Sequence, residues 1–134
     1  METVNSKEPK LPLYATYGTL RKGMGNDRLL DNEHCVLLGT QKTDANYKMV
    51  SLGGYPGVIP GEGTQQIVVE VYSVSSKDVE RSLDRLESFP RFYQKMEIDT
   101  QWGKATMYIL SEEKYGHLPI VASGDWKQYV KSKY

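Results

Sequence analysis

The sequence predicts a fold in which several short β-strands combine with a few short helices. Apolar and β-branched residues recur in short segments, residues 76–88 carry an amphipathic helical pattern, and residues 92–110 resemble a hairpin. A chain of 134 residues can bury a sizeable core and fits one domain, residues 1–134. With 39% hydrophobic and 25% charged residues, the composition is that of a globular protein rather than a disordered one.

Charge and targeting patterns argue against several classes of protein. Lys and Arg together number 17, as do Asp and Glu, and without a basic block nothing favours nucleic-acid binding. No apolar run approaches the roughly 18 residues of a membrane span. Residues 1–10 are polar and of mixed charge, which indicates a loose tail rather than a signal peptide. Cys35 is the single cysteine and cannot form an intrachain disulfide, so we expect a reducing, cytoplasmic setting.

The first half of the chain alternates strands with turns. Residues 26–31 predict a short helix with Asn26 or Asp27 as its cap. Residues 52–63 hold five of the 12 glycines together with prolines, so we expect a loop there rather than a helix or a central strand. The segments that predict strands are residues 13–17, 36–40, 47–51 and 67–74.

The second half opens with the clearest helix. Ser75 or Ser76 caps it, and Val79, Leu83 and Leu86 form one apolar face that we expect to be buried. The helix is expected to end near residue 88, because Pro90 disfavours helical structure in the residue before it.

A hairpin and shorter elements follow this helix. Residues 92–100 and 104–110 predict two strands that turn at Gly103. We expect a polar loop at residues 111–116, a last short strand at 120–122 and a final helix at 126–131.

The turn after the first strand is the first candidate site. A strand that breaks at Gly18 can direct successive backbone N–H groups toward one point, and such a nest binds an anion or an oxyanion. We expect a conformation or a close contact at Gly18 that a Cβ atom would obstruct. An ordinary turn fits the same residues, so both interpretations stay open. The residues of this turn are Tyr17, Gly18, Thr19 and Leu20.

Metal ligation and nucleophilic catalysis find little support. His34, Cys35 and His117 are the only typical soft or borderline ligands, and adjacent strand residues such as His34 and Cys35 point to opposite faces. No nucleophile elbow and no phosphate-binding loop is present. We therefore expect no metal.

Carboxylates remain as candidates for proton transfer. Glu87 lies on the flank of the buried helix face, in the last turn, where the helix dipole raises the pKa of a carboxylate. The apolar bend that follows it could shield it from water and raise its pKa further. Glu80 has a similar bearing on the helical wheel, and an exposed glutamate that merely ends a helix is a further alternative.

Several motifs together resemble the γ-glutamylcyclotransferase family, including its AIG2-like and γ-glutamylamine cyclotransferase branches. Tyr-Gly-Thr-Leu at 17–20, followed by Arg-Lys-Gly, resembles its opening signature. Gly-Gly-Tyr-Pro-Gly-Val at 53–58 and Val-Glu-Val-Tyr at 69–72 are similar to its glycine–aromatic–proline loop and its central strand. Leu-Asp-Arg-Leu-Glu at 83–87 resembles the helix that ends in the family's catalytic glutamate.

Two further matches lie toward the C-terminus. Tyr93 stands two residues before Lys95, where the family more often has arginine, and Ser-Gly-Asp-Trp at 123–126 resembles a common ending. The resemblance covers roughly residues 12–130, and the order and spacing of the motifs make it specific.

The resemblance implies an α+β fold, a small barrel-like mixed β-sheet with a few short helices. It also implies a reaction without a cofactor, in which a γ-glutamyl amide or peptide cyclises to 5-oxoproline and releases an amine or amino acid. Glu87 would be the catalytic base, residues 17–20 would hold the substrate, and Tyr55 and Tyr93 would complete the binding pocket. A binding or regulatory protein on the same fold is the alternative. Neither the particular γ-glutamyl compound nor the oligomeric state follows from the sequence.

Overall fold

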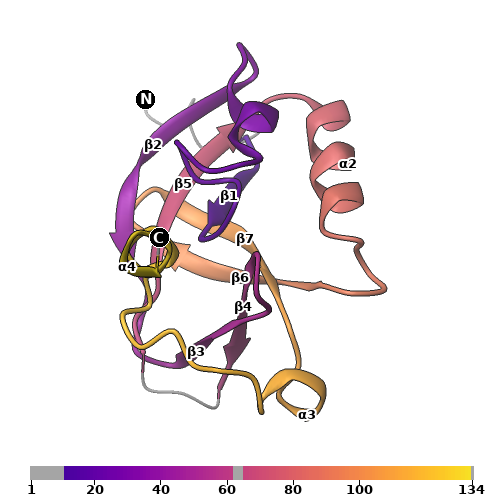
Figure 1. Cartoon of the computed structure of the whole chain (residues 1–134). Coiled ribbons are helices and arrows are strands. Elements are labelled where there is room, and N and C mark those ends of the chain that lie inside the picture. Colours follow the sequence, from indigo (N-terminus) through magenta and orange to yellow (C-terminus); the bar gives the residue numbers. More distant parts are fainter. Residues whose placement is uncertain (1–10, 62–64, 134) are drawn as a thin grey trace.

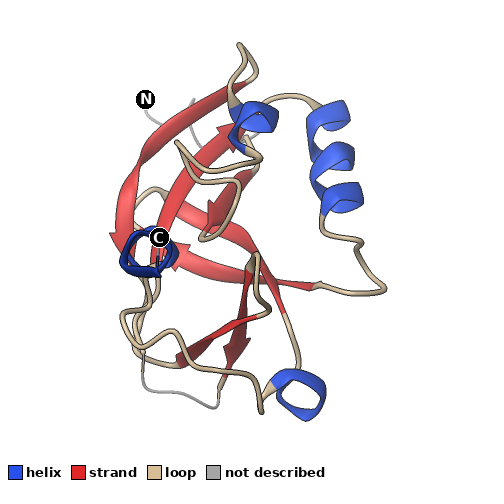
Figure 2. Cartoon of the chain, in the orientation of Figure 1, coloured by secondary structure: helices blue, strands red, loops and turns tan. Residues whose placement is uncertain are grey.

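The main sheet has five strands in the order β2-β5-β1-β7-β6 (Figures 1 and 2). The computed structural model describes residues 11–61 and 65–133, so the tail predicted at residues 1–10 lies outside the described residues. β1 runs antiparallel to β5 and parallel to β7, which makes the sheet mixed, and β6 and β7 form the predicted hairpin. The strand bounds are β1 Leu13–Thr16, β2 Cys35–Lys42, β5 Val68–Val74, β6 Gln94–Thr100 and β7 Gly103–Ile109.

A second sheet has two strands, β3 (Tyr47–Ser51) and β4 (Pro56–Pro60). β4 falls within the glycine-rich segment that the sequence predicts as a loop, so that prediction is wrong for these residues. Proline is tolerated because it occupies the two ends of β4, in a strand that pairs only with β3. The N–H group of Leu110 donates to the carbonyl oxygen of Val58 at 2.9 Å and joins this sheet to the end of β7.

Short helices complete the α+β architecture. The predicted helix near residue 27 is a single 3₁₀ turn, η1 (Asp27–Leu30), and the Asn26 side chain makes no capping bond to it. The predicted polar loop at 111–116 instead contains α3 (Glu112–Tyr115), which Ser111 caps. The last predicted strand is reduced to one bridge between Val50 and Ile120. Helices α2 (Lys77–Leu86) and α4 (Trp126–Lys133) confirm the other two helix predictions, and no helix of the described residues is long and apolar enough to span a membrane.

The central strand β5 is buried on both faces of the sheet. Val69 and Val71 point into one core cluster, which also contains Trp126 of α4. Tyr72 and Val74 belong to a second cluster that contains Leu83 of α2. In Figure 1 the main sheet curves and the two-stranded sheet lies across its lower end, a barrel-like arrangement with α2 on one side. The predicted fold class is therefore confirmed.

The prediction that the apolar face of α2 is buried is wrong at its last residue, Leu86. Ser76 caps the helix by accepting a hydrogen bond from the N–H group of Val79 at 3.3 Å, and Leu83 is fully buried. Leu86, however, remains 38% exposed, because the helix ends there and the chain turns away from the core. This end of α2 forms one wall of a cavity rather than part of the core.

Candidate active site

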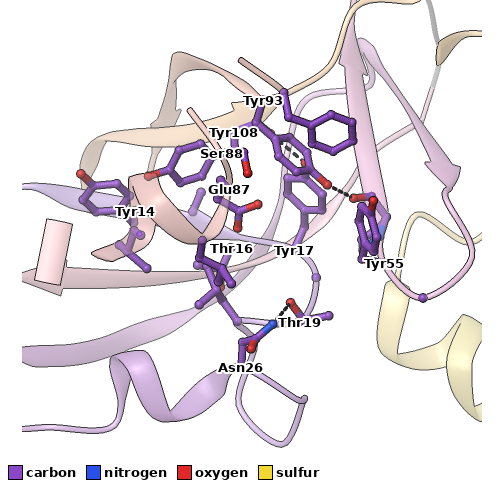
Figure 3. Close-up of a pocket in the computed structure, with 18 residues that line it drawn as sticks. Tyr14, Thr16, Tyr17, Thr19, Asn26, Tyr55, Glu87, Ser88, Tyr93 and Tyr108 are labelled. Carbon is purple, nitrogen blue, oxygen red and sulfur yellow. Dashed lines mark hydrogen bonds between the residues drawn. The ribbon is translucent and has the colours of Figure 1, made fainter. Parts of the chain in front are cut away.

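A cavity of about 420 Å³ lies where the end of β1, the end of α2 and the start of β4 meet (Figure 3). All seven site residues predicted from the sequence line it. They are Tyr17, Gly18, Thr19, Leu20, Tyr55, Glu87 and Tyr93. The chain therefore brings together residues that are separated by up to 76 positions in the sequence.

Glu87 contributes the only charged side chain among the described residues that line the cavity. It is the C-cap residue of α2, so the helix end directs it toward the cavity, as Figure 3 shows. Burial of the carboxylate raises its pKa from 4.5 to about 7. No hydrogen bond or ion pair to another described residue holds the Glu87 side chain. The carboxylate is thus available to exchange a proton with a ligand near neutral pH.

The structure separates Glu87 from Glu80, which the helical wheel could not do. Glu80 does not line the cavity, and its Oε1 accepts a hydrogen bond from the Tyr14 hydroxyl group at 2.8 Å. Glu80 therefore anchors α2 to β1, and Glu87 alone presents a carboxylate to the cavity.

The turn at residues 17–20 is fixed by contacts on several sides. The Tyr17 hydroxyl group donates to the backbone oxygen of Tyr108 at 2.8 Å, and Thr19 Oγ1 accepts from Asn26 at 2.9 Å. A Cβ atom on Gly18 would lie 2.9 Å from Cγ and Cδ of Pro56, which confirms the expected obstruction. The amide of Arg21 bonds to the Gly18 carbonyl, as in a tight turn.

The backbone N–H groups of this turn have spare capacity. Within residues 11–61 and 65–133, no hydrogen bond outside the regular helices and strands is donated by the amides of Gly18, Thr19 or Leu20. Backbone donors that line a cavity can bind an anion without a cationic side chain. These amides are the candidate anion-binding groups of the cavity.

Aromatic residues form another part of the cavity wall. The Tyr93 hydroxyl group donates to the carbonyl oxygen of Pro56 at 2.6 Å, which links the segment before β6 to the start of β4. The Phe92 ring packs edge-on against Tyr93 and against Tyr55, with centroid distances of 4.8 and 6.3 Å. Tyr55 is 42% exposed, so it lies at the solvent side of the cavity.

Several residues that line the cavity were not predicted from the sequence. The principal ones are Tyr14, Thr16, Asn26, Phe92 and Tyr108. Tyr14 and Tyr108 come from the adjacent strands β1 and β7, and their rings stack at 6.3 Å. The only available signal was the tyrosine at an inward position of each strand, which is equally typical of a core residue.

The three residues that the sequence offers as typical soft or borderline metal ligands do not converge on the cavity. His34 lies just before β2, Cys35 is the first residue of β2, His117 is exposed after α3, and none of them lines the cavity. No group of three or more His, Cys, Asp or Glu side chains suited to a metal occurs in the part of the chain that the structure describes.

Taken together, the structure is that of an α+β protein with a cavity lined by a carboxylate of near-neutral pKa and by a turn whose amides at residues 18–20 donate no bond in the described part of the chain. A family model described as "Gamma-glutamyl cyclotransferase, AIG2-like" matches residues 14–128. The chain therefore belongs to the AIG2-like γ-glutamyl cyclotransferase family.

Three relatives illustrate the match. A Vibrio cholerae protein is 40% identical over 118 residues, which is 88% of this chain and 97% of its own length. The gamma-glutamylcyclotransferase family protein YtfP of Escherichia coli K12 is 38% identical over 110 residues, or 82% of this chain and 91% of YtfP. The solution structure of E. coli YtfP superimposes with a TM-score of 0.67 over 88% of this chain and 98% of its own, at 32% identity. The gamma-glutamylaminecyclotransferase B of Danio rerio is 32% identical over 123 residues, 87% of this chain and 63% of the fish protein.

Proposed function

We propose that this protein is a cofactor-independent γ-glutamyl cyclotransferase. The free α-amine of a γ-glutamyl amide or peptide attacks the γ-carbonyl carbon of the same molecule. A new C–N bond closes the five-membered ring, the bond to the leaving nitrogen breaks, and 5-oxoproline and an amine or amino acid are released. The α-amine loses one proton and the leaving nitrogen gains one, so atoms and electrons balance without an oxidant or a metal.

The position and pKa of Glu87 carry this proposal. An α-amine has a pKa near 8 and must be unprotonated to attack. When the neutral amine attacks, its nitrogen sheds one proton, which a carboxylate with a pKa of about 7 accepts readily at neutral pH and can then donate to the leaving nitrogen. With its usual pKa of 4.5, the same group would be a much weaker base.

The rest of the cavity supports the proposal by positioning the substrate. Because the nucleophile is part of the substrate, the enzyme mainly has to fold the molecule so that the amine faces the carbonyl. Well-oriented intramolecular reactions reach effective molarities of ~10⁵–10⁸ M. In the proposed complex, the amides of residues 18–20 bind the substrate carboxylate or the developing oxyanion, and Tyr55 and Tyr93 close the aromatic wall.

A substrate panel tests the proposal. Purified protein is incubated with γ-glutamyl amides and γ-glutamyl dipeptides, and 5-oxoproline is quantified by mass spectrometry. Analogues acetylated on the α-amine serve as controls because they lack the nucleophile. We expect 5-oxoproline from at least one free-amine substrate and none from its acetylated analogue.

Isotope labelling separates cyclisation from hydrolysis. In H₂¹⁸O, cyclisation releases 5-oxoproline without label, whereas hydrolysis releases glutamate that carries ¹⁸O. If every panel member is left intact but calorimetry detects binding, the protein is a binding or regulatory member of the fold, and the proposed activity is wrong.

A further inference from the structure

A cluster of four charged side chains, two of them buried, adjoins the turn at residues 17–20. Arg21 and Glu70 are 5% and 4% exposed, and they are joined by Asp125 and Lys127 from the C-terminal segment. The cluster contains two positive and two negative groups. The motif at residues 123–126, to which the proposed chemistry gives no role, supplies Asp125.

Glu70 is the centre of this cluster because each of its carboxylate oxygens has a partner. Its Oε1 accepts the backbone N–H group of Lys22 at 2.7 Å. Its Oε2 accepts Arg21 Nε at 3.1 Å and Lys127 Nζ at 2.9 Å. A buried carboxylate is costly unless it is paired and hydrogen-bonded, and here these requirements are met.

The backbone of Glu70 holds the other end of the same turn. Thr16 and Glu70 are paired residues of β1 and β5, and the Thr16 hydroxyl group donates to the Glu70 carbonyl oxygen at 3.0 Å. One residue of β5 thus holds both residue 16 and residue 22, which flank the turn that lines the cavity. Arg21 is held again from the other side by Asp125, at 2.8 Å.

This arrangement goes beyond general stabilisation of the core. Replacing a buried ion network by apolar residues is often neutral or stabilising, so such a network is weak evidence for stability alone. The network here fixes one five-residue segment between two anchor points, and residues 17–20 of that segment line the cavity. Fixed donors bind an anion better than mobile ones because no ordering cost is incurred on binding.

We propose that Glu70 is a positioning residue, which holds the turn at residues 17–20 in its ligand-binding geometry, with Asp125 as the second anchor through Arg21. The link to catalysis rests on the proposed γ-glutamyl cyclotransferase function. The effect of Glu70 on the geometry of the turn does not rest on that function, and it is tested separately.

Amide hydrogen exchange of residues 17–22 is the direct test, and it is read chiefly at Arg21, whose N–H group donates to the Gly18 carbonyl oxygen and so reports on closure of the turn. Glu70→Gln keeps the side-chain length but removes the charge that binds Arg21 and Lys127. We expect exchange in this segment to become at least about tenfold faster, as after loss of charge-assisted hydrogen bonds. Asp125→Asn, which leaves Glu70 intact, should accelerate exchange in the same segment by a smaller factor. It also serves as the deciding variant should Glu70→Gln fail to fold.

Ile98→Ala is the control. It removes buried apolar volume from β6 at a residue that does not line the cavity, and it therefore lowers stability without loosening either anchor. If the charge variants accelerate exchange at residues 17–22 no more than Ile98→Ala does, Glu70 has no positioning role and the inference is wrong.

Kinetics provide the second readout. With the substrate identified by the panel, Glu70→Gln should raise KM by about tenfold or more while kcat falls less, because substrate binding is weakened before proton transfer is. In the proposed mechanism, protonation of Glu87 lowers the rate at acidic pH, and the pH at which this occurs should be the same in Glu70→Gln as in the wild type. Should the wild-type protein release no 5-oxoproline, the proposed function fails, and hydrogen exchange still decides the role of Glu70.

Discussion

The hydroxyl group of Tyr108 donates a hydrogen bond of 2.6 Å to Oδ1 of Asp84. Tyr108 belongs to β7 and Asp84 to α2, three residues before Glu87. Lys95 of β6 pairs with the same Asp84 oxygen at 2.8 Å. Two strands of the hairpin therefore hold the last turn of the helix from which Glu87 projects.

Removing the Tyr108 hydroxyl group should disturb that turn. We expect Tyr108→Phe to lower the free energy of unfolding by about 1–3 kcal/mol and to lower kcat, because Asp84 loses one of its two partners. Tyr14→Phe is the matched control, since it removes a similar bond to Glu80, seven residues before Glu87. Urea denaturation and steady-state kinetics should show comparable losses of stability but a larger loss of kcat for Tyr108→Phe.

Glu87→Gln should abolish turnover without abolishing binding. Glutamine preserves the shape of the side chain but cannot accept the proton, and general acid–base catalysis contributes ~10²–10⁴-fold. Glu80→Gln is the control and should keep activity near that of the wild type. Calorimetry with a substrate analogue that cannot cyclise should show that both variants bind. An inactive Glu80→Gln beside an active Glu87→Gln would mean that the base is assigned to the wrong residue.

The raised pKa of Glu87 also makes stability depend on pH. Between its ordinary value of 4.5 and its folded value of about 7, the native state keeps a proton that the unfolded chain has lost. The free energy of unfolding should therefore fall as pH rises through this window, by on the order of 3 kcal/mol, and then level off.

Glu87→Gln removes this titration and supplies the comparison. Relative to the wild type, the variant should gain stability as the pH is raised from about 5 to about 8, as measured by urea denaturation. Parallel stability curves for the two proteins would indicate that Glu87 titrates at its ordinary value.

Gly18→Ala should impair ligand binding because the new Cβ atom would lie 2.9 Å from the Pro56 ring. Relief of that contact moves either the turn or the start of β4, and overpacking of this kind costs about 1–3 kcal/mol. Gly25→Ala is the control, since a Cβ atom there meets nothing within 4 Å. Calorimetry should show lost or much weaker binding only for Gly18→Ala, and unchanged affinity would argue against a ligand at this turn.

Two leucines of α2 should respond differently to truncation. Leu83 is fully buried, so Leu83→Ala should cost about 2–5 kcal/mol in the free energy of unfolding. Leu86 is 38% exposed, and Leu86→Ala should cost clearly less while still altering KM, because Leu86 lines the cavity. Thermal denaturation of both variants, with KM values, checks this difference; equal losses of stability would contradict it.

The strands and the long helices follow from local patterns. Val69 and Val71 alternate along β5, and Val79 and Leu83 recur at helical spacing in α2. Both patterns arise because these residues pack against the core, so both can be recognised in the sequence. β4 was not predicted because its glycine and prolines disfavour a strand. In the folded chain, pairing with β3 overrides that preference. α3 was not predicted because a helix of four residues is too short to show a helical repeat in the sequence.

The site was predictable where a residue has a distinctive chemical role, and not where it acts through tertiary contacts. Glu87 and Gly18 could be named as candidates from their positions, at the end of an amphipathic helix and at the break of the first strand, and the motif resemblance favoured Glu87 over Glu80. Tyr108 and Glu70 could not be named in this way. Their contacts with α2 and with the turn after β1 form only in the folded chain, and an inward tyrosine or a glutamate on a strand has no sequence signal for such contacts.

Pro56 connects the two sheets around the cavity: its carbonyl oxygen binds Tyr93, and its ring abuts Gly18. Residues 17–20 follow β1 of the main sheet, and Glu87 follows α2, which packs on that sheet. The segment at residues 52–55, which contains Tyr55, connects β3 and β4 of the small sheet. Substitutions in that segment would alter the rim of the cavity and leave Glu87 in place. Pro56 is therefore the structural boundary between a rim that can change and the pocket floor that holds Glu87.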